Sequence, residues 1–289
     1  MTLEQLRIFV GVAERQHVTR AAEALNITQS AASAAIAALE ARHGVPLFNR
    51  VGRGIELTEA GRMFLDEARA VLGRAASAEQ ALADYAGLKR GTLRLVASQT
   101  IASYWLPPRL ATFHDRYPAI AVELAIDNSE GAAARVLNGA AELGFVEGMI
   151  DEPALAHWPI ASDRMVLVGR KAVEVVDQTW LCQARWIVRE QGSGTRSSFE
   201  DALRRDGIDP AMLPIAMTLP SNEAVRTAVE AGAGVAVLSE LVVESALAAG
   251  TLHMLPLDLP ARRFHALRHK ERYRTRAADV LTDLVKELA

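Results

Sequence analysis

Residues 18–42, VTRAAEALNITQSAASAAIAALEAR, decide how the N-terminal part of the chain folds. Their first eight residues form a short alanine-rich pattern typical of a helix, and the following Asn and Ile interrupt it. A second helix is predicted from Thr28 to about Arg42, because the Thr28 hydroxyl can accept a hydrogen bond from a backbone N–H one turn on. Gly44 supplies a left-handed C-terminal position, and Pro46 prevents continuation. Two short helices with so brief a connection indicate a helix-turn-helix.

A helix-turn-helix places its second helix in the major groove of DNA. In the predicted helix, Ala32, Ile36 and Leu39 share one face and should face a core. Polar side chains near the N-terminus can reach base edges, and Gln suits the donor and acceptor of adenine. On its own, the pattern also fits an ordinary amphipathic helix with a solvated polar face. The candidate base-contacting residues are Thr28, Gln29, Ser30 and Ser33.

A compact two-stranded wing is predicted directly behind the second helix. Residues 44–61 read GVPLFNRVGRGIELTEAG, with Gly52 and Gly54 at the tip. Arg50 and Arg53 lie in this wing and are the candidate phosphate contacts, because cations that neutralise phosphates supply the sequence-independent part of DNA affinity.

Residues 3–62 together resemble the winged helix-turn-helix of LysR-type transcriptional regulators. The matching pieces are Leu3-x-x-Leu6-x-x-Phe9, Ala21-Ala22-x-x-Leu25, Thr28-Gln29-Ser30-Ala31, Leu39-Glu40, Leu47-Phe48-x-Arg50, Arg53-Gly54 and Leu57-Thr58-x-Ala60-Gly61. One feature departs from the family, which usually carries Arg or Lys after the Ser33 position, whereas residues 34–38 read AAIAA. Direct base readout should therefore be sparse, with more of the recognition left to the wing arginines and to DNA shape.

The length and composition fit a globular protein of two or three domains. The chain has 289 residues, of which 50% are hydrophobic and 23% charged. Its formal net charge is −3, and the basic and acidic side chains of residues 1–60 cancel. Bulk charge therefore argues mildly against DNA binding. The motif outweighs it, since a few well-placed arginines on an oligomer suffice for phosphate contacts.

Several absences narrow the class of protein. The single cysteine, Cys182, allows no internal disulfide, and no apolar run reaches membrane-spanning length. The N-terminus shows no secretion signal, so a cytoplasmic protein without membrane contact is expected. No nucleophile elbow, phosphate-binding loop, paired cysteines or zinc-protease motif occurs, and the seven histidines lack metal-ligand spacing. We therefore expect no enzyme activity, no metal and no cofactor.

A long helix is predicted from Thr58 to about Gly87. Its apolar positions step by three and four residues, as in a short coiled coil, and they are Ala68, Val71, Ala75, Ala78, Leu82 and Tyr85. A single helix cannot bury such a stripe alone, so a homodimer is predicted, with packing on the chain's own C-terminal part as the alternative. The family resemblance makes this element the dimerising linker helix, and it adds a homotetramer and RNA polymerase as expected partners.

Beyond a hinge at residues 87–91, short β-rich runs alternate with helical ones, which indicates α/β domains. Strands are predicted at residues 92–97, 120–126, 141–146, 164–168, 186–189, 215–219, 235–238 and 262–268. Helices are predicted at residues 106–118, 129–137, 194–205, 222–231 and about 275–288. Two such lobes joined by two crossovers resemble the periplasmic-binding-protein-like effector domain of LysR-type regulators. The expected domains are residues 1–58 (winged helix-turn-helix), 59–87 (linker helix) and 88–289 (effector domain), with lobe I at about 92–163 and 261–289 and lobe II at about 164–260.

Four loops in this domain follow a strand and open a helix with small hydroxyl or amide residues. Ligands bind at the carboxyl ends of strands in such folds, and helix N-termini attract anions. Capping of the helix N-terminus would be enough to explain one such loop. Four such loops that face one cleft favour a ligand-binding site instead. The candidate effector-binding residues are Ser98, Gln99, Thr100, Asn128, Ser129, Glu147, Arg189, Ser193, Thr195 and Asn222.

The charged candidates have structural alternatives. Glu147 could accept from a ligand hydroxyl or pair with an arginine, and Arg189 and Arg196 could neutralise an anion or form surface pairs. The basic run from Arg262 to Arg276 is interpreted as a solvated strand edge, with contact to DNA or to a sister subunit as the minority alternative.

The effector is expected to be a small oxyanion such as sulfite or sulfate, with a small carboxylate or a phosphorylated metabolite second. The cleft is rich in donors, and residues 97–101, 143–148 and 189–196 resemble the family branch that controls sulfur assimilation and carbon fixation. Gln99 stands where that branch more often has Thr. The competing functions are a solute-binding or enzymatic α/β protein with an incidental helical domain, and a DNA binder without a ligand.

Overall fold

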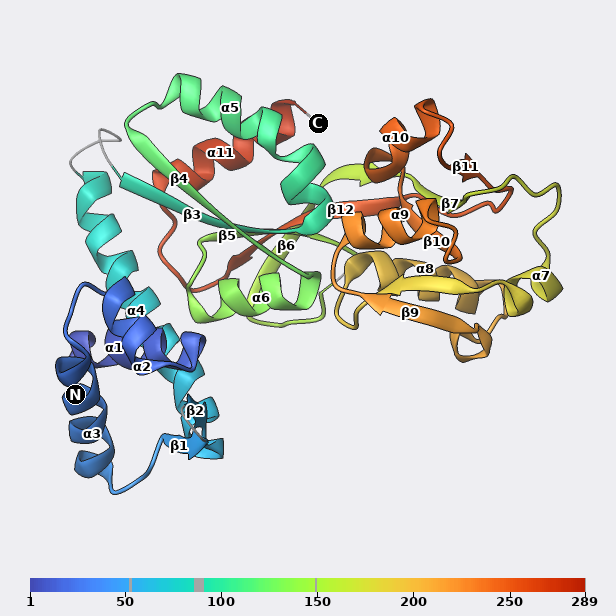
Figure 1. Ribbon diagram of the computed structural model, residues 1–289. Helices are drawn as coiled ribbons and strands as arrows, with labels where there is room; N and C mark the ends of the chain where they lie inside the picture. The colour runs from blue at the N-terminus through green and yellow to red at the C-terminus, as the bar shows by residue number, and fades with distance from the viewer. Residues whose placement is uncertain (52–53, 86–90, 149, 289) are drawn as a thin grey trace. The chain divides into compact units, whose positions relative to one another are not determined.

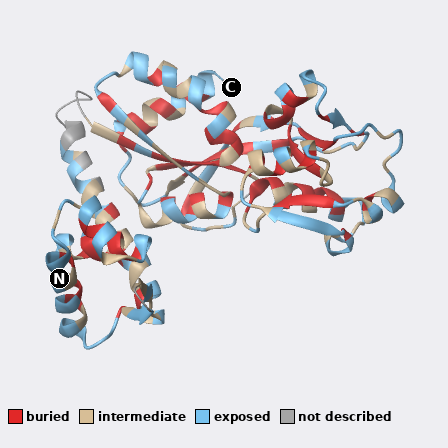
Figure 2. Cartoon of the chain, viewed as in Figure 1, coloured by how far each residue is buried: buried red, intermediate tan, exposed pale blue. Residues whose placement is uncertain are grey.

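The computed structural model describes residues 1–51, 54–85, 91–148 and 150–288. The chain divides into two compact units, an N-terminal one ending at Tyr85 and a C-terminal one that carries nearly all of the remaining residues. Figure 1 labels the elements, and Figure 2 shows buried residues concentrated in the strands and inner helix faces of each unit.

The N-terminal unit is the predicted winged helix-turn-helix followed by a long helix. Its elements are α1 (Leu3–Arg15), α2 (Val18–Ala24), α3 (Gln29–His43), β1 (Phe48–Val51), β2 (Gly54–Leu57) and α4 (Glu59–Tyr85). Leu6, Phe9 and Leu39 are buried together at its centre, with Ala32 and Ile36 of α3 in the adjoining cluster. The predicted core face of α3 is thus confirmed.

Local signals position the helices of this motif. Thr28 Oγ1 accepts from the backbone N–H of Ala31 at 3.2 Å and so caps α3, as predicted. Asn26 adopts the left-handed conformation between α2 and α3, which Asn tolerates better than most residues. Gly44 ends α3 at φ 65°. Glu40 then accepts from the N–H of Leu47 at 2.7 Å, which ties the wing to α3.

Only part of the apolar seam predicted for α4 is exposed to solvent. Ala68 is 1% exposed and belongs to the core of its own winged helix-turn-helix, so its assignment to a dimer seam is wrong. The helix crosses that core in its first turns, and only later turns extend beyond it. Val71 and Leu82 remain 41% and 77% exposed, and Ala78 is exposed. Tyr85 has no described side chain.

Lobe I of the C-terminal unit contains a five-stranded sheet of order β4-β3-β5-β12-β6. Its strands are β3 (Gly91–Ser98), β4 (Ile120–Asp127), β5 (Leu143–Glu147), β6 (Leu155–Asp163) and β12 (Arg262–His269). β3 runs parallel to β4 and β5, whereas β12 runs antiparallel to β5 and β6. Its helices are the π-helix η1 (Ile101–Trp105), α5 (Pro107–Arg116), α6 (Ser129–Asn138) and α11 (Arg276–Glu287), and Figure 1 shows α5 and α11 on one face of the sheet and α6 on the other.

Lobe II is built around a second five-stranded sheet of order β11-β7-β10-β8-β9. Its strands are β7 (Met165–Gly169), β8 (Trp186–Arg189), β9 (Ile215–Leu219), β10 (Val235–Ser239) and β11 (His253–Met254). Its helices are α7 (Gln178–Gln183), α8 (Gly194–Arg205), the short 3-10 helix η2 (Pro210–Met212), α9 (Asn222–Glu230) and α10 (Glu240–Ala248). The chain crosses from lobe I between β6 and β7 and returns after β11, so the predicted two-lobed fold is confirmed.

The structure corrects the interpretation of the basic run. β12 is an interior strand between β5 and β6 and is not an edge. Its first residue, Arg262, is 6% exposed and lies opposite Asp163 of β6 in the register. Because this cation is buried beside a carboxylate, a solvated strand edge is the wrong description of it. Arg274 is exposed and pairs with Asp279 at 2.6 Å, as ordinary surface ion pairs do.

Candidate functional site

The predicted base-contacting residues lie at the exposed N-terminal end of α3. Thr28, Gln29 and Ser30 are exposed, and Ser33 is half-buried one turn further on. Thr28 Oγ1 and Ser30 Oγ lie 3.0 Å apart, and Gln29 Nε2 donates to Ser33 Oγ at 3.4 Å. These weak local contacts leave the side chains accessible to the edges of bases.

The wing carries one described candidate for a phosphate contact. Arg50 is exposed on β1, where it pairs in register with Ile55 of β2. No carboxylate of the described residues lies within ion-pair distance of it, so its charge is available to a phosphate. Arg53 lies outside the described residues.

The predicted effector residues gather where the strands of both lobes end. Ser98 is the last residue of β3, Glu147 of β5 and Arg189 of β8. Because β12 runs antiparallel to its neighbours, it begins at this same edge with Arg262, where β6 ends with Asp163. This is the edge at which open α/β folds bind ligands.

Hydrogen bonds that centre on Asn222 and Gln99 join the two lobes. Asn222 Nδ2 donates to Thr100 Oγ1 at 3.0 Å, and Arg189 Nη1 donates to Asn222 Oδ1 at 2.6 Å. Gln99 adds two further bonds, accepting from the Asn222 N–H at 2.8 Å and donating to the Pro220 carbonyl at 3.0 Å. Thr100 and Asn222 are both 0% exposed, so protein partners fix them.

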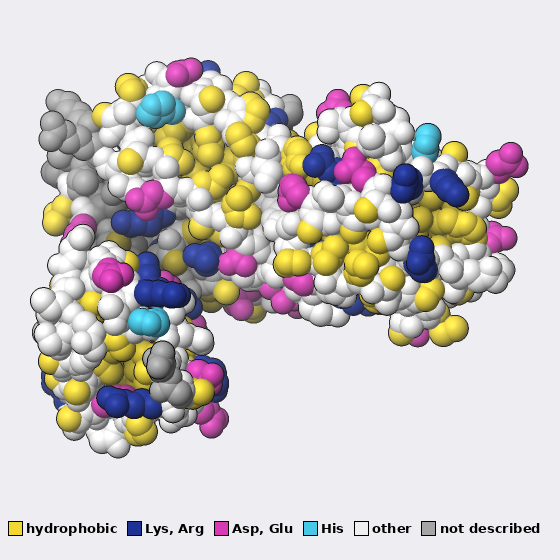
Figure 3. All heavy atoms as spheres, viewed as in Figure 1, with side chains coloured by type: hydrophobic (Ala, Val, Ile, Leu, Met, Phe, Trp, Pro, Cys, Tyr) yellow, Lys and Arg dark blue, Asp and Glu magenta, His cyan; other side chains and the backbone are white. Residues whose placement is uncertain are grey.

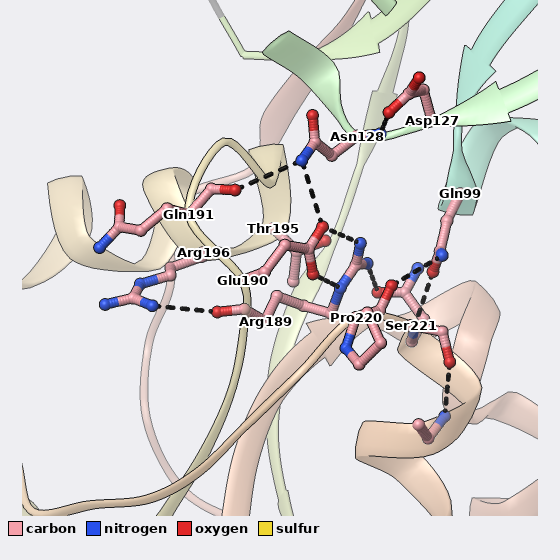
Figure 4. A network of polar contacts seen from close by, with 12 residues as sticks. Gln99, Asp127, Asn128, Arg189, Glu190, Gln191, Thr195, Arg196, Pro220 and Ser221 are labelled. Carbon is pink, nitrogen blue, oxygen red and sulfur yellow. Dashed lines mark hydrogen bonds and ion pairs between the residues drawn. The ribbon is translucent and has the colours of Figure 1, made fainter. Parts of the chain in front are cut away.

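A second set of contacts joins the lobes through Glu190 (Figure 4). Arg189 Nε and Nη2 donate to the two Glu190 oxygens, each at 2.8 Å. Asn128 Nδ2, from lobe I, lies 3.4 Å from Glu190 Oε1 and 3.3 Å from the Gln191 carbonyl. Burial by itself would raise the pKa of Glu190, but the hydrogen bonds and charge of Arg189 outweigh it and hold that pKa below its usual value. The carboxylate is therefore ionised and paired.

Arg262, which we do not predict from the sequence as a site residue, lies at the centre of the contacts. Its guanidinium donates to Asp163 at 2.7 Å, to Thr195 Oγ1 at 3.1 Å and to Thr100 Oγ1 at 3.3 Å, and Glu147 Oε1 is 3.7 Å away. Burial raises the pKa of Asp163, and the adjacent Arg262 charge opposes that rise. One guanidinium thus touches a threonine from each lobe. We call this set, together with Gln99, Asn128, Arg189, Glu190 and Asn222, the interlobe network.

The N-termini of α6 and α8 meet closely at the same edge. Ser129 Oγ donates to Glu147 Oε2 at 3.1 Å, which orients that carboxylate. A Cβ placed on Gly194, the first residue of α8, would stand 2.6 Å from Ser129 Oγ and 2.8 Å from Glu147 Cβ. Only glycine fits this position, because any side chain would force the two lobes apart.

Two predicted donors, Ser98 and Ser193, differ from the rest in their contacts among the described residues. Ser98 Oγ is buried without a partner among the described residues. Ser193 is 3% exposed and precedes α8 without making the side-chain bond to the helix N-terminus that Ser221 makes at α9. These hydroxyls, and the N–H groups at the start of α8, can still donate.

The remaining charged candidates, Glu147 and Arg196, contact neighbouring residues of the chain. Glu147 is held by Ser129 and lies near Arg262. Arg196 forms the ion pair that was the alternative to anion binding, because its Nε donates to Glu200 at 2.7 Å, and its Nη1 donates to the Arg189 carbonyl at 3.2 Å. Among the described residues, no group of three or more His, Cys, Asp or Glu side chains could hold a metal ion, and no helix is long and apolar enough to cross a membrane.

Two protein-family models match the chain. Residues 3–62 match the bacterial regulatory helix-turn-helix domain of the lysR family, and residues 86–289 match the LysR substrate binding domain. The helix-turn-helix is therefore no incidental addition to a solute-binding or enzymatic protein.

Curated relatives and solved structures agree with these matches. YeiE of Escherichia coli, an uncharacterized HTH-type transcriptional regulator, is 34% identical over 96% of this chain and 94% of its own length. A probable RuBisCO transcriptional regulator of Trichormus variabilis is 32% identical over 97% of this chain and 86% of its own.

Two solved structures illustrate the fold. Full-length CbnR in complex with its target DNA aligns with a TM-score of 0.70 and 22% identity, covering 100% of both chains. The regulatory domain of CcmR from Synechocystis, solved with 2-PG, aligns with a TM-score of 0.61 and 26% identity over 69% of this chain and 97% of that one. The winged helix-turn-helix, the two α/β lobes and both family matches together show that this chain belongs to the LysR family of DNA-binding transcriptional regulators.

Proposed function

We propose that the effector of this regulator is a small oxyanion, sulfite or sulfate, bound at the interlobe network, and that binding changes the affinity for operator DNA. A small carboxylate or phosphorylated metabolite is the runner-up. The observation that carries the proposal is the buried, unpartnered Ser98 hydroxyl beside a network of further hydroxyl donors.

The donors suit an oxyanion for energetic reasons. A buried hydroxyl without a partner costs about 1–3 kcal/mol, which a ligand oxygen would recover. The start of α8 presents backbone N–H groups and a partial positive charge. The side chain of its N-cap residue, Ser193, does not accept a hydrogen bond from these N–H groups. Thr195, in the first turn of α8, has a hydroxyl proton to donate while its oxygen accepts from Arg262.

The surrounding charges limit the size and charge of the ligand. Arg189 and Arg262 are each paired with a carboxylate, and Glu147 adds a third acid nearby. A large polyanion would meet these carboxylates, whereas a small anion needs only the hydroxyls and the helix N-terminus. The complex of the related CcmR regulatory domain with 2-PG supports a ligand in the equivalent domain.

The network also explains how binding would act on the lobes. Gln99, Thr100 and Asn128 of lobe I already bond to lobe II. An anion that prefers this closed arrangement would shift the population of the domain towards it, and only such a preference can drive a switch. The proposed active species is a homodimer formed through α4, with the tetramer and the contact to RNA polymerase carried over from the family.

Calorimetric titration of the full-length protein tests the effector assignment. Sulfite, sulfate, phosphate and small carboxylates would be titrated at constant ionic strength, and we expect saturable heat from sulfite or sulfate. Ser98→Ala and Thr195→Ala should each weaken that binding about tenfold, as expected for the loss of one hydrogen bond to a charged group.

Thr112→Ala is the matched control, because the Thr112 hydroxyl of α5 donates only to the Pro108 carbonyl. It should leave the titration unchanged. Heat from none of these anions would overturn the proposal, as would an undiminished response in both Ser98→Ala and Thr195→Ala.

A further inference from the structure

A pocket lies in lobe II, at the opposite end of the sheet from the interlobe network. β8 and β10 both begin there, at Trp186 and Val235, and β7 ends there at Gly169. The pocket has a volume of about 790 Å³. Figure 3 shows an apolar area bordered by Lys and Arg side chains on the lobe II part of the surface. We call the pocket lined by these strand ends the lobe II pocket.

Three cations line the lobe II pocket without an acidic partner among the described residues. They are Arg170, Lys171 and Arg185, all exposed, and no Asp or Glu lines the pocket. Within the part of the chain that the structure describes, Arg170 Nη1 donates only to the Ala231 carbonyl at 3.5 Å, and Arg185 Nη2 only to the Gly232 carbonyl at 3.4 Å. These are weak contacts to neutral acceptors. By contrast, both buried arginines of the interlobe network are paired with carboxylates.

The rest of the pocket is apolar and aromatic. Trp180 is half-buried in the wall and packs edge-on against the fully buried Trp186, with ring centroids 6.5 Å apart. Val173 and Leu255 extend the apolar surface. Because Trp186 supports it, the Trp180 ring is a fixed surface on which a flat ligand can stack.

We propose that the lobe II pocket binds a second ligand, an organic phosphate that carries a flat ring, of which a nucleotide is the type. An inorganic anion would use the cations but leave the aromatic wall uncovered, and a neutral ring would leave three cations unpaired. The volume lies within the range of about 300–1,000 Å³ typical of sites for metabolite-sized and drug-sized ligands. The phosphates would lie against Arg170, Lys171 and Arg185, and the ring against Trp180.

The strands of lobe II connect this pocket to the interlobe network. Arg185 directly precedes β8, whose last residue, Arg189, holds Asn222. β10 likewise starts at the pocket with Val235 and ends with Ser239, which donates to Asp163 at 2.8 Å. Four residues of strand span about 13 Å, so one rigid strand reaches both sites. A ligand in the pocket would therefore be a second input to the same lobe closure.

Titration of the full-length protein with ATP, followed by calorimetry, tests the proposal. ATP should bind saturably. Adenosine and inorganic phosphate should each bind at least tenfold more weakly, because adenosine lacks the phosphates and inorganic phosphate lacks the ring. Arg185→Gln and Arg170→Gln should each weaken ATP binding about tenfold, the effect expected for one charged hydrogen bond. Arg205→Gln is the matched control, because that exposed arginine also donates to a backbone carbonyl, that of Asp201, and does not line the pocket.

The outcomes separate this proposal from the effector assignment. Thr195→Ala should leave saturable ATP binding in place, whatever its effect on sulfite or sulfate. No saturable ATP binding would overturn the proposal. Equal affinity in the Arg170, Arg185 and Arg205 variants would also overturn it, as would loss of ATP binding in Arg50→Ala, which would place the nucleotide on the DNA-binding unit.

Discussion

The two units of this regulator use the same kinds of residue in opposite ways. At the start of α3, Thr28, Gln29 and Ser30 are exposed and bond weakly to one another. At the interlobe network, residues of the same types, among them Thr100 and Asn222, are fully buried and bonded across the lobes. A hydroxyl or amide at a helix N-terminus therefore has no fixed role, because its burial decides what it can do.

The difference has an energetic consequence. Exposed polar groups exchange water for a base or phosphate at little cost to the fold, so their substitution should change binding alone. Buried polar groups have lost their water, and removing one partner leaves the other unsatisfied. Substitutions in the interlobe network should therefore reduce stability as well as change the response to the effector.

The largest expected effect comes from Arg262→Met. It would leave Asp163 buried without its cation, which should lower the free energy of unfolding of the C-terminal unit by about 3–5 kcal/mol. All four tryptophans lie beyond residue 100, so urea unfolding followed by tryptophan fluorescence reports on this unit. Arg274→Met is the control, since that exposed pair should contribute less than about 1 kcal/mol. Equal losses for the two variants would contradict the contrast between buried and exposed charges.

The linker helix provides the next test. Leu82→Glu and Ala78→Glu place a charge on the exposed part of α4, and each should weaken the proposed dimer at least tenfold while leaving the monomer folded. Ala68→Glu should instead unfold the N-terminal unit, because Ala68 is buried in its core. Sedimentation velocity with circular dichroism separates the two outcomes, and Glu79→Gln serves as the exposed control. A dimer that survives both Leu82→Glu and Ala78→Glu is not formed through this face.

Substitutions on the DNA-binding face should be smaller in effect and leave stability unchanged. Gln29→Ala should reduce discrimination between the operator and altered operators by about 1–3 kcal/mol. Arg50→Ala should weaken binding to all sequences alike and lower the salt slope by about one unit. Fluorescence anisotropy over a series of salt concentrations measures both, with Arg116→Ala of lobe I as the control. If Arg50→Ala leaves the salt slope intact, its assignment as a phosphate contact is wrong.

The smallest expected effect is a dependence of the stability of lobe I on pH. His265 is 6% exposed, its Nδ1 has no partner among the described residues, and burial lowers its pKa, with His157 nearby adding to the shift. The unfolded chain, with an ordinary histidine pKa of about 6.5, then binds the proton more readily than the folded one. The stability contributed by neutral His265 should be fully present above a pH of about 6.5 and should decline as the pH falls towards the lower pKa of the folded state. His265→Gln should flatten the decline in urea titrations, whereas His253→Gln, at an exposed site, should not.

Much of this architecture was predictable from local signals. Thr28 as a cap, Gly44 as a helix end, and the apolar positions of α3 follow from rules that span a few residues, and the structure confirms them. The same holds for β9 and α8, where the predicted and observed bounds coincide. The effector candidates follow from a similar signal, because they stand where a strand ends and a helix begins, except Glu147, which only ends a strand.

The remaining features depend on contacts between distant parts of the chain. Arg262 looked like one member of a basic run, and only the pairing of β12 with β6 places it opposite Asp163, 99 residues earlier. Ala68 continued a regular heptad seam, but the packing of α4 on its own winged helix-turn-helix buries it. The lobe II pocket likewise joins residues from three separate strand ends. No sequence window of helix or strand length contains such information.

The central claim is that an anion at the interlobe network controls binding to DNA, and one measurement tests it most directly. The affinity of the full-length protein for the DNA upstream of its own gene would be measured by anisotropy, with and without sulfite or sulfate, at constant ionic strength. The account predicts a change of roughly 5–150-fold, the usual range of coupling between two sites, and a smaller change in Ser98→Ala at an anion concentration that half-saturates the unchanged protein. An affinity unchanged by either anion, or changed equally in Ser98→Ala, would contradict it.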